Sequence, residues 1–396
     1  MKRSTDRIIV SHAGILPRPP ELQAIMGPTF ATQAVDETAF KQMVPGLVKD
    51  VVKRQADIGI DVVNDGELGK RGGFSFYVQS RLGGLERSTP ENEPPARNIS
   101  ARDQVDFPGF FSGNLGGFGR LPGVQPTAGA PVRINVPIFC RGPLTYVGQE
   151  QVKFDIETMK AALAEVSGVE GYLPAIAPGT IEHWLFNDYY KDDEELLFAI
   201  ADAMHDEYKA ITDAGLILQI DDPDLPDGWQ MFPDMSVADY RKYAQLRVDA
   251  LNHALRDCPT ELIRLHVCWG SGHGPHKHDI PFKDIIDIVF NTRAENFSFE
   301  ASNVRHEHEW DVFETFKIPD GASIMPGVIG HASDLIEHPE LIARRLERYA
   351  NLVGRENVIA GTDCGLGSRV GHSEIAWAKL EAMVEGAQLA SKRLWG

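Results

Sequence analysis

Short apolar runs alternate with longer amphipathic stretches along most of the chain. The short runs are rich in β-branched and aromatic residues and are bounded by Gly, Pro, Asn or Asp, which is typical of β-strands. The longer stretches carry apolar residues at helical spacing, which indicates α-helices with one buried face. The pattern therefore predicts strands at 8–12, 61–65, 135–140, 172–176, 216–221, 262–268, 296–300, 324–329 and 357–362.

Helices are predicted between these strands. Residues 192–213 are the clearest case, with acidic residues in the first turn and Gly215 just past the end. Strands that alternate with helices run parallel in one sheet, so the predicted fold class is α/β, a (β/α)8 TIM barrel. We expect residues 1–396 to form one such domain, with one strand candidate more than the barrel needs. Similar stretches predict helices at 237–256, 283–294, 334–353 and 373–393.

Residues 82–132 interrupt this alternation and predict a long inserted loop. Its first part is polar and Pro-rich, and its second part is rich in Gly and Pro but also carries phenylalanines. A loop of this length inside a compact domain is usually functional or disordered, and the aromatic side chains argue against disorder. We expect the segment either to cover a substrate site or to make a dimer contact, using Phe107, Phe110, Phe111 or Phe118.

Four potential metal ligands stand at the ends of predicted strands: His266, Cys268, Glu300 and Cys364. His266 and Cys268 are two residues apart, so their side chains point to the same side of a strand. The carboxyl ends of parallel strands meet at one face of a barrel, where such folds carry their chemistry. Two thiols, an imidazole and a carboxylate brought together there would form a tetrahedral site for Zn²⁺.

Cysteines and histidines also have interpretations that involve no metal. The alternative for Cys268 and Cys364 is that they are small buried core residues, as free cysteines often are. Their placement at strand ends favours the metal site, whereas Cys140 and Cys258 lack such a setting and are interpreted as structural. Five further histidines either build a second metal site or, as we prefer, orient the ligands or serve as polar loop residues: His273, His276, His278, His306 and His308.

Acidic residues follow two other predicted strands, Asp65 and Glu67 after one and Asp221 and Asp222 after the other. At this face of a barrel, carboxylates bind an ammonium group or take part in acid–base chemistry. The alternative is that they cap the helices that follow. His331 comes after another predicted strand, and on the metal face it would be a candidate general acid.

Composition limits the classes of partner. The chain has 396 residues, 43% of them apolar, and is large enough for a sizeable core. A net charge of −18 repels phosphate backbones, so nucleic acid is not an expected partner. No apolar run approaches the ~20 residues of a membrane-spanning helix, and the N-terminus lacks the apolar core of a secretory signal. Four cysteines in a chain of this length do not suggest a disulfide framework, so we expect the protein to be located in the reducing cytoplasm.

Taken together, these segments resemble the catalytic domain of cobalamin-independent methionine synthase, and the likeness spans nearly the whole chain. Several of the motifs are weak when taken singly, but their order along the chain is specific. The resemblance is carried by HAGILPRP (12–19), VVNDGE (62–67), LQIDDP (218–223), HVC (266–268), the strand-ending Glu300, GVIGH (327–331) and DCGLGSR (363–369).

The resemblance implies a methyltransferase that moves a methyl group from a folate-type donor to the thiol of homocysteine, giving methionine. Zinc ligation lowers the pKa of a thiol, so the substrate would bind as the thiolate. The carboxylate ligand is expected to loosen when this thiolate arrives, because a fifth donor crowds a tetrahedral site. The zinc ligands implied by the resemblance are His266, Cys268, Glu300 and Cys364.

The resemblance also implies roles for residues that bind the substrates. Glu67 and Asp221 match carboxylates that lie near the amino group of homocysteine, and His331 matches the proton donor. Trp184, in APGTIEHWLF, matches a tryptophan that contacts folate, and Arg133 matches a folate-contacting position more loosely. The expected partners are therefore a small-molecule thiol and a methyl or alkyl donor, with a homo-oligomer as a further option.

The chain departs from the family in three ways. It has room for one barrel, whereas the full-length synthase has two, so we expect part of the usual folate surface to be missing. Ile15 stands where the family usually has Ser beside the amino-acid carboxylate, and GVIGH is one residue shorter than the family pattern. Single-barrel relatives include epoxyalkane:coenzyme M transferases, so the alternative is a zinc-dependent alkyltransferase that uses another thiol or electrophile.

Two further classes are open but less favoured. A zinc hydrolase would keep water at the metal, but thiolate-rich ligation makes zinc a weaker Lewis acid. A purely structural zinc would have four closed ligands and would not respond to an added thiol.

Overall fold

The computed structural model describes residues 1–26, 36–70, 77–89, 91–92, 94, 100–111, 137–270, 274–367 and 369–396. Its centre is an eight-stranded parallel sheet in the order β1-β11-β10-β9-β8-β7-β5-β2. The two ends of this sheet meet, because Asp61 N–H donates to the Val10 carbonyl at 2.9 Å and Ser11 Oγ donates to Val62 O at 2.9 Å. These strands are β1 Ile9–Val10, β2 Val62–Asn64, β5 Glu170–Ile176, β7 Ile217–Asp221, β8 Ile263–Val267, β9 Asn296–Phe299, β10 Ser323–Ile329 and β11 Ile359–Thr362.

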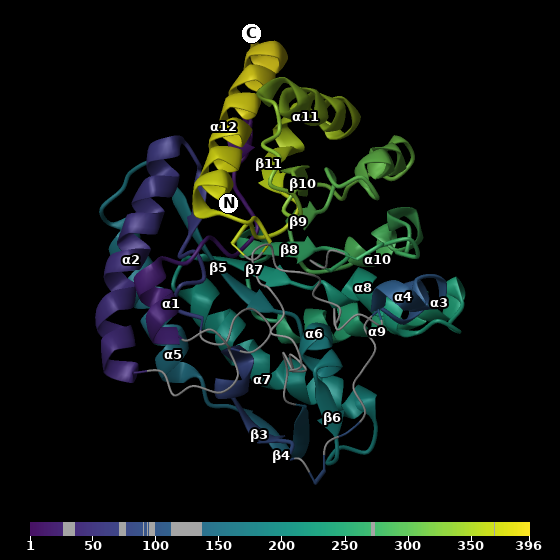
Figure 1. Ribbon diagram of the computed structural model, residues 1–396. Coiled ribbons are helices and arrows are strands. Elements are labelled where there is room, and N and C mark those ends of the chain that lie inside the picture. Colours follow the sequence, from purple (N-terminus) through teal and green to yellow (C-terminus); the bar gives the residue numbers. More distant parts are fainter. Residues whose placement is uncertain are drawn as a thin grey trace.

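Helices surround this sheet on its outer side (Figure 1), which confirms the predicted TIM barrel. The core between strands and helices is formed by buried Val, Leu, Ile, Phe and Ala side chains. The long helices are α2 Glu37–Ile58, α5 Gln149–Leu163, α7 Asp193–Asp213, α9 Val237–Ala254, α11 Pro339–Val353 and α12 Ser373–Trp395. The shorter ones are α1 Pro20–Met26, α3 Ala101–Asp106, α4 Pro108–Phe111, α6 Pro178–His183, α8 Asp224–Met231 and α10 Ile286–Val289.

The predicted helix at 283–294 is wrong in extent. The structure has a 3₁₀ turn at Phe282–Asp284 and then only α10. Beyond Phe290, the backbone forms hydrogen bonds with the Asn252 side chain of α9. This side chain donates to Asn291 O at 2.9 Å and accepts from Arg293 N at 2.7 Å. These bonds to a neighbouring helix replace the bonds that would have continued α10.

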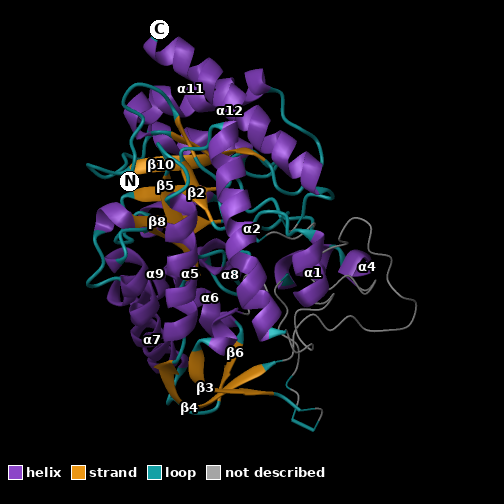
Figure 2. Ribbon diagram, turned by 90° about the vertical axis from the view of Figure 1, so that its left-hand side faces the viewer, coloured by secondary structure: helices purple, strands orange, loops and turns teal. Residues whose placement is uncertain are grey.

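The surplus strand candidate lies outside the barrel. It corresponds to β4 Ile138–Tyr146, which pairs with β3 Leu82–Arg87 and β6 Leu185–Asn187 in a separate three-stranded sheet. Figure 2 shows this sheet at the end of the molecule opposite α11 and α12. The first residues of the predicted loop 82–132 are therefore a strand, because their backbone pairs with β4.

The small sheet is attached to the barrel helices by a buried arginine. Arg81, just before β3, pairs with Asp155 of α5 and with Glu207 of α7, the latter at 2.8 Å. Glu207 also accepts a hydrogen bond from Tyr146 of β4 at 2.7 Å. A guanidinium fixed between two buried carboxylates orients the sheet, and removing it would leave both charges uncompensated.

The barrel interior is filled in layers, as the parallel register requires. Gln219, Arg264 and Asn296 are aligned across β7, β8 and β9. They form one layer, in which Arg264 donates to Gln219 Oε1 at 3.2 Å and to Asn296 Oδ1 at 2.9 Å. Because the strand period is two, the residues two positions further on point inward one layer nearer the carboxyl ends.

Candidate metal centre at the mouth of the barrel

The next interior layer contains Asp221, His266 and Ser298, which are aligned across β7, β8 and β9. All three side chains are buried. This layer lies at the carboxyl ends of the strands, where β7 and β8 give way to the loops that follow. The register of the sheet therefore brings a carboxylate, an imidazole and a hydroxyl to the floor of the barrel mouth.

Three of the four predicted ligands come together at the barrel mouth, and one of them, His266, belongs to the layer just described. The ligand atoms of His266, Cys268 and Cys364 all lie within 4.8 Å of one another. His266 and Cys268 come from β8 and the residue just past it, whereas Cys364 follows β11. Strands β9 and β10 separate β8 from β11 in the sheet, so these side chains converge across the mouth.

The orientation of His266 suits a metal ligand. Its Nδ1 lies 2.9 Å from Ser298 Oγ, a contact that fixes the ring. Its Nε2 is buried and has no hydrogen-bond partner among the residues that the structure describes. A buried imidazole nitrogen without a partner is costly, and metal-binding histidines are usually held by a hydrogen bond at the other nitrogen.

The two thiols influence each other's ionisation. Hydrogen bonding to Cys268 holds the pKa of Cys364 well below its usual range, while the same contact and burial raise the pKa of Cys268 well above it. His266 also favours the Cys364 thiolate. One thiolate therefore forms readily in this cluster, and a second would require an added positive charge.

Glu300 lies in an adjoining group rather than inside the three-residue cluster. Its carboxylate is within 4.8 Å of ligand atoms of His331 and Asp363. Oε1 accepts from Trp269 N at 3.1 Å, and Oε2 accepts from the Asn303 side chain. Burial, together with the charges of Asp363 and Cys364, raises the pKa of Glu300 well above its usual range. The four predicted ligands thus occupy neighbouring positions, with the carboxylate set to one side.

His331 follows β10 and is buried at the same mouth. Neither ring nitrogen has a hydrogen-bond partner in the described part of the chain. Burial lowers the pKa of His331 to about 4, partly offset by Cys364. The shortened GVIGH segment thus still brings this imidazole next to Glu300 and Asp363.

A second group of carboxylates borders the cluster. Burial raises the pKa of Glu67 to about 8 and that of Asp221 to about 6, and the charge of Asp221 adds to the shift of Glu67. Glu67 has a φ of 57°, and a Cβ at Gly14 would lie 2.8 Å from its Oε1, so Gly14 leaves room for this carboxylate. The charge of Lys70 lowers both pKa values, and Oε2 of Glu67 has no hydrogen-bond partner among the described residues.

The predicted folate-contacting Trp184 lies at the end of α6, where its backbone N–H donates to Ile181 O at 3.1 Å. Helix α6 follows β5 and packs against α7 and α9. Nearby, Thr180 donates to Asp222 at 3.2 Å, so this acid supports α6 rather than facing the cluster. Arg133 lies outside the described residues.

The additional histidines are bound mainly to carboxylates. Asp279 Oδ2 lies 2.9 Å from His276 Nδ1 and 3.1 Å from His306 Nε2. The ring of His306 stacks on Trp269 with centroids 3.9 Å apart, and Trp269 is the residue whose N–H holds Glu300. His278 pairs with Asp106, His308 is exposed, and His273 lies outside the described residues.

The described part of the predicted insertion docks on loops at this face. Arg102 of α3 donates to Trp229 O at 2.7 Å and to Met235 O at 2.9 Å. Asp103 accepts from Lys277 N at 3.2 Å and from His278 N at 2.9 Å, in the loop after β8. Phe110, however, is 39% exposed, and Phe118 lies outside the described residues. Polar contacts attach α3 to the loops, and Phe107 adds one of the expected aromatic contacts, because the Lys277 ammonium lies over its ring at 5.8 Å from the centroid.

Sequence reasoning missed the residues that hold the predicted ligands in place. Ser298 orients His266, Asn303 and Trp269 hold Glu300, and Asp363 precedes Cys364 and reaches across to the loop after β9. Ser298 could have been found, since it lies two residues before Glu300 and so faces inward. The long-range contacts of Asp363 have no comparable signal in the sequence.

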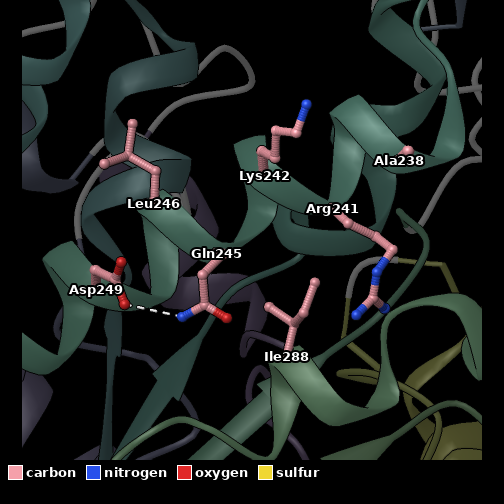
Figure 3. Close-up of a pocket in the computed structure, with 7 residues that line it drawn as sticks. All are labelled: Ala238, Arg241, Lys242, Gln245, Leu246, Asp249 and Ile288. Carbon is pink, nitrogen blue, oxygen red and sulfur yellow. Dashed lines mark hydrogen bonds between the residues drawn. The ribbon is translucent and has the colours of Figure 1, made fainter.

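A groove of about 540 Å³ lies elsewhere, between α9 and α10 on the outer layer of the barrel (Figure 3). Its arginine is already paired, because Arg241 contacts Asp287 at 2.7 Å. The groove holds no thiol or imidazole, so its chemistry differs from that of the barrel mouth. The residues lining it are Ala238, Arg241, Lys242, Gln245, Leu246, Asp249 and Ile288.

The fold and the site define a class of protein: a TIM barrel with a thiol-rich candidate metal centre at its carboxyl face. Comparison with known proteins specifies the family. The family model of the cobalamin-independent synthase catalytic domain matches residues 140–389, more than half of the chain. The chain therefore belongs to the cobalamin-independent methionine synthase family. No helix in the described part of the chain is long and apolar enough to span a membrane.

Relatives agree with this assignment. The methionine synthase of Sulfurisphaera tokodaii is 25% identical over 288 residues, covering 72% of this chain and 74% of that protein. That of Thermococcus kodakarensis is 26% identical over 226 residues, covering 56% of this chain and 58% of its own length.

Solved structures share the fold. A B12-independent methionine synthase from a Shewanella species, in complex with selenomethionine, superposes with a TM-score of 0.71 at 18% identity. A putative vitamin-B12-independent methionine synthase from Listeria monocytogenes gives 0.66 at 15% identity. Each comparison covers 98% of this chain and 99% of the other.

Proposed function

We propose that this protein is a zinc-dependent methyltransferase that transfers a methyl group from a folate-type donor to the thiol of homocysteine, giving methionine. Family membership supports the reaction class, and the relatives named methionine synthase support the product. The observation that carries the proposal is the convergence of His266, Cys268 and Cys364 within 4.8 Å at the barrel mouth.

The residues present fit zinc. Two thiols, an imidazole with a buried unpartnered Nε2 and a nearby carboxylate form the S₂NO donor set that Zn²⁺ accepts in tetrahedral geometry. We assign His266, Cys268, Cys364 and Glu300 as the ligands. Bound zinc would supply the charge that keeps a substrate thiol deprotonated at neutral pH. Trp269 N–H and Asn303 hold the Glu300 carboxylate to one side, which suits the ligand that yields to the substrate.

Asp221 and Glu67 are proposed to bind the ammonium group of the amino-acid substrate. Both carboxylates are buried beside the cluster, and burial raises their pKa values, with the charge of Asp221 adding to the shift of Glu67. An ammonium group placed between them would relieve that cost, which gives the pocket a preference for a cationic substrate group. Trp184 is proposed to contact the donor.

His331 is proposed to supply the proton that the departing donor nitrogen needs. Its ring lies within 4.8 Å of the carboxylates of Glu300 and Asp363. Burial lowers its pKa to about 4, so the proposed role requires that the ring take up a proton when further negative charge, such as a substrate thiolate, enters the site. A folate nitrogen leaves poorly unless it is protonated, so a positioned acid is required at this step.

A thiol alkyltransferase that uses another thiol or electrophile is the second candidate, and Ile15 favours it. Ile15 stands in the loop after β1, where a Cβ on Gly365 would lie 2.7 Å from Ile15 Cγ2. An apolar side chain therefore lies beside the turn that follows Cys364, where a hydroxyl would bind an amino-acid carboxylate. A hydrolase remains less favoured because two thiolates weaken the Lewis acidity of the metal.

The proposed partners are small molecules, and the proposed compartment is the cytoplasm. The site needs reduced thiols, and reducing compartments keep them available. The net charge of −18 disfavours phosphate-rich polymers. A homo-oligomer is also compatible with a single-barrel enzyme of this type.

Replacing Cys364 with Ser should abolish tight zinc binding, because a hydroxyl ligates zinc far more weakly than a thiolate. Metal analysis should find about one zinc per wild-type chain and strong loss in the variant. Cys258→Ser, which alters a buried cysteine away from the cluster, is the matched control and should retain zinc. Tight zinc retention in Cys364→Ser would show that the ligand set is wrong.

Replacing Asp221 with Asn should weaken homocysteine binding by about 1.5–3 kcal/mol, the typical contribution of a hydrogen bond to a charged group. Titration calorimetry should show a much smaller change for 3-mercaptopropionate, a thiol that lacks the amino group. Equal losses for both thiols would indicate a structural role for Asp221. If the wild type binds neither thiol, the homocysteine assignment is wrong.

Replacing His331 with Ala should lower methyl transfer by ~10²–10⁴-fold, the usual contribution of general acid catalysis. Thiol binding and zinc content should stay near wild type, since the proposed role concerns only the leaving group. The rate is best followed by transfer of an isotope-labelled methyl group from methyltetrahydrofolate. Unchanged turnover would remove His331 from the mechanism, and loss of zinc would make it a ligand or a support for one.

A further inference from the structure

Asp363 joins two of the loops that carry the proposed ligands. It lies between β11 and Cys364, and its carboxylate crosses to the loop that follows β9, which begins with Glu300. Oδ1 accepts from Ala301 N at 2.8 Å and from Ser302 N at 2.9 Å. Oδ2 accepts from Ser302 Oγ at 2.7 Å. One side chain therefore ties the backbone just after Glu300 to the backbone just before Cys364.

The strand between these two loops leaves space for the Asp363 side chain. Strand β10 lies between β9 and β11 in the sheet. A Cβ at Gly327 of β10 would lie 2.1 Å from Asp363 Oδ1 and 2.6 Å from its Cα, a distance that no side chain can tolerate. Gly327 is thus required by the close approach of Asp363. The pairing of β10 with β11 is also irregular at this point, between Gly327 and Ile329.

A second residue supports the same crossing from outside the barrel. Arg345 of α11 donates to Val328 O at 2.9 Å and lies 3.5 Å from Ser302 O. Its Nε donates to Glu307 at 3.0 Å, further along the loop after β9. The loop that begins at Glu300 is therefore held at Ser302 by both Asp363 and Arg345.

Asp363 could instead be a metal ligand, because its carboxylate lies within 4.8 Å of Glu300 and His331. Its hydrogen bonds argue against that role. A carboxylate has about four lone-pair positions, and three of them accept from Ala301 and Ser302. Glu300, by comparison, accepts one bond at each oxygen and keeps more capacity for a metal.

We infer that Asp363 is a positioning residue that fixes the distance between Glu300 and Cys364, and so preforms the metal centre without binding the metal. This inference rests on the proposed zinc site. Outer hydrogen-bond partners of metal ligands typically contribute 10–100-fold to metal affinity. An aspartate that braces two ligand-bearing loops should act in the same range.

Cobalt(II) substitution of the whole protein tests this, because thiolate-to-cobalt absorption reports ligand geometry directly and chelator competition gives the affinity. Asp363→Ala should weaken cobalt binding 10–100-fold and lower or shift the thiolate band. Asp363→Asn should stay within about threefold of wild type, since its amide oxygen can keep both N–H bonds and its NH₂ can donate to Ser302 Oγ. Ser302→Ala, which removes one of the three bonds, should fall between them. Asp320→Ala, an exposed acid before β10, should match wild type.

The outcomes separate the alternatives. If Asp363→Asn loses affinity as severely as Asp363→Ala, the charge itself is needed and Asp363 is a ligand. Wild-type affinity and an unchanged band in Asp363→Ala would also overturn the inference. If Asp363→Ala does not fold, Asp363→Asn and Ser302→Ala decide between the same two roles. A wild-type protein that shows no thiolate-to-cobalt band would instead refute the proposed metal site.

Discussion

The parallel register of β7, β8 and β9 is the constraint on which the site depends. It aligns Gln219, Arg264 and Asn296 in one interior layer, and the two-residue period of the strands then fixes Asp221, His266 and Ser298 in the next. Arg264 is buried and hydrogen-bonded within the lower layer, which lies directly beneath the layer that contains His266. A shift of one residue in β8 would turn His266 out of the barrel and bring an apolar neighbour in.

Electrostatics at the barrel mouth favours the binding of cations. The Cys268 thiol and the carboxylates of Glu67, Asp221 and Glu300 are buried there, the Cys364 thiol is half-buried, and burial raises the pKa of each carboxylate. Only one of the thiols, Cys364, has a pKa below its usual range. A divalent metal at the thiols and an ammonium group at Glu67 and Asp221 would each compensate nearby negative charge.

The sequence predicts the barrel and the convergence of its strand-end residues well, because both follow from periodicity. It predicts neither the placement of the surplus strand β4 in a separate sheet nor the short length of α10, since these depend on tertiary pairing with β3 and with Asn252. The hydrogen bonds by which Asp363 links the two loops could not be predicted from the sequence either. Its partners lie more than 60 positions away, and nothing in the local pattern distinguishes a carboxylate that accepts backbone bonds from one that binds metal.

The central claim is that the cluster of His266, Cys268 and Cys364 activates a substrate thiol through zinc. Zinc-edge X-ray absorption of the zinc-loaded protein, recorded with and without homocysteine, tests it most directly. We expect the zinc to have two sulfur neighbours in the free protein and three after homocysteine is added, with one fewer nitrogen or oxygen neighbour. An unchanged spectrum at saturating homocysteine would contradict the account, because a closed site that gains no sulfur cannot activate the thiol.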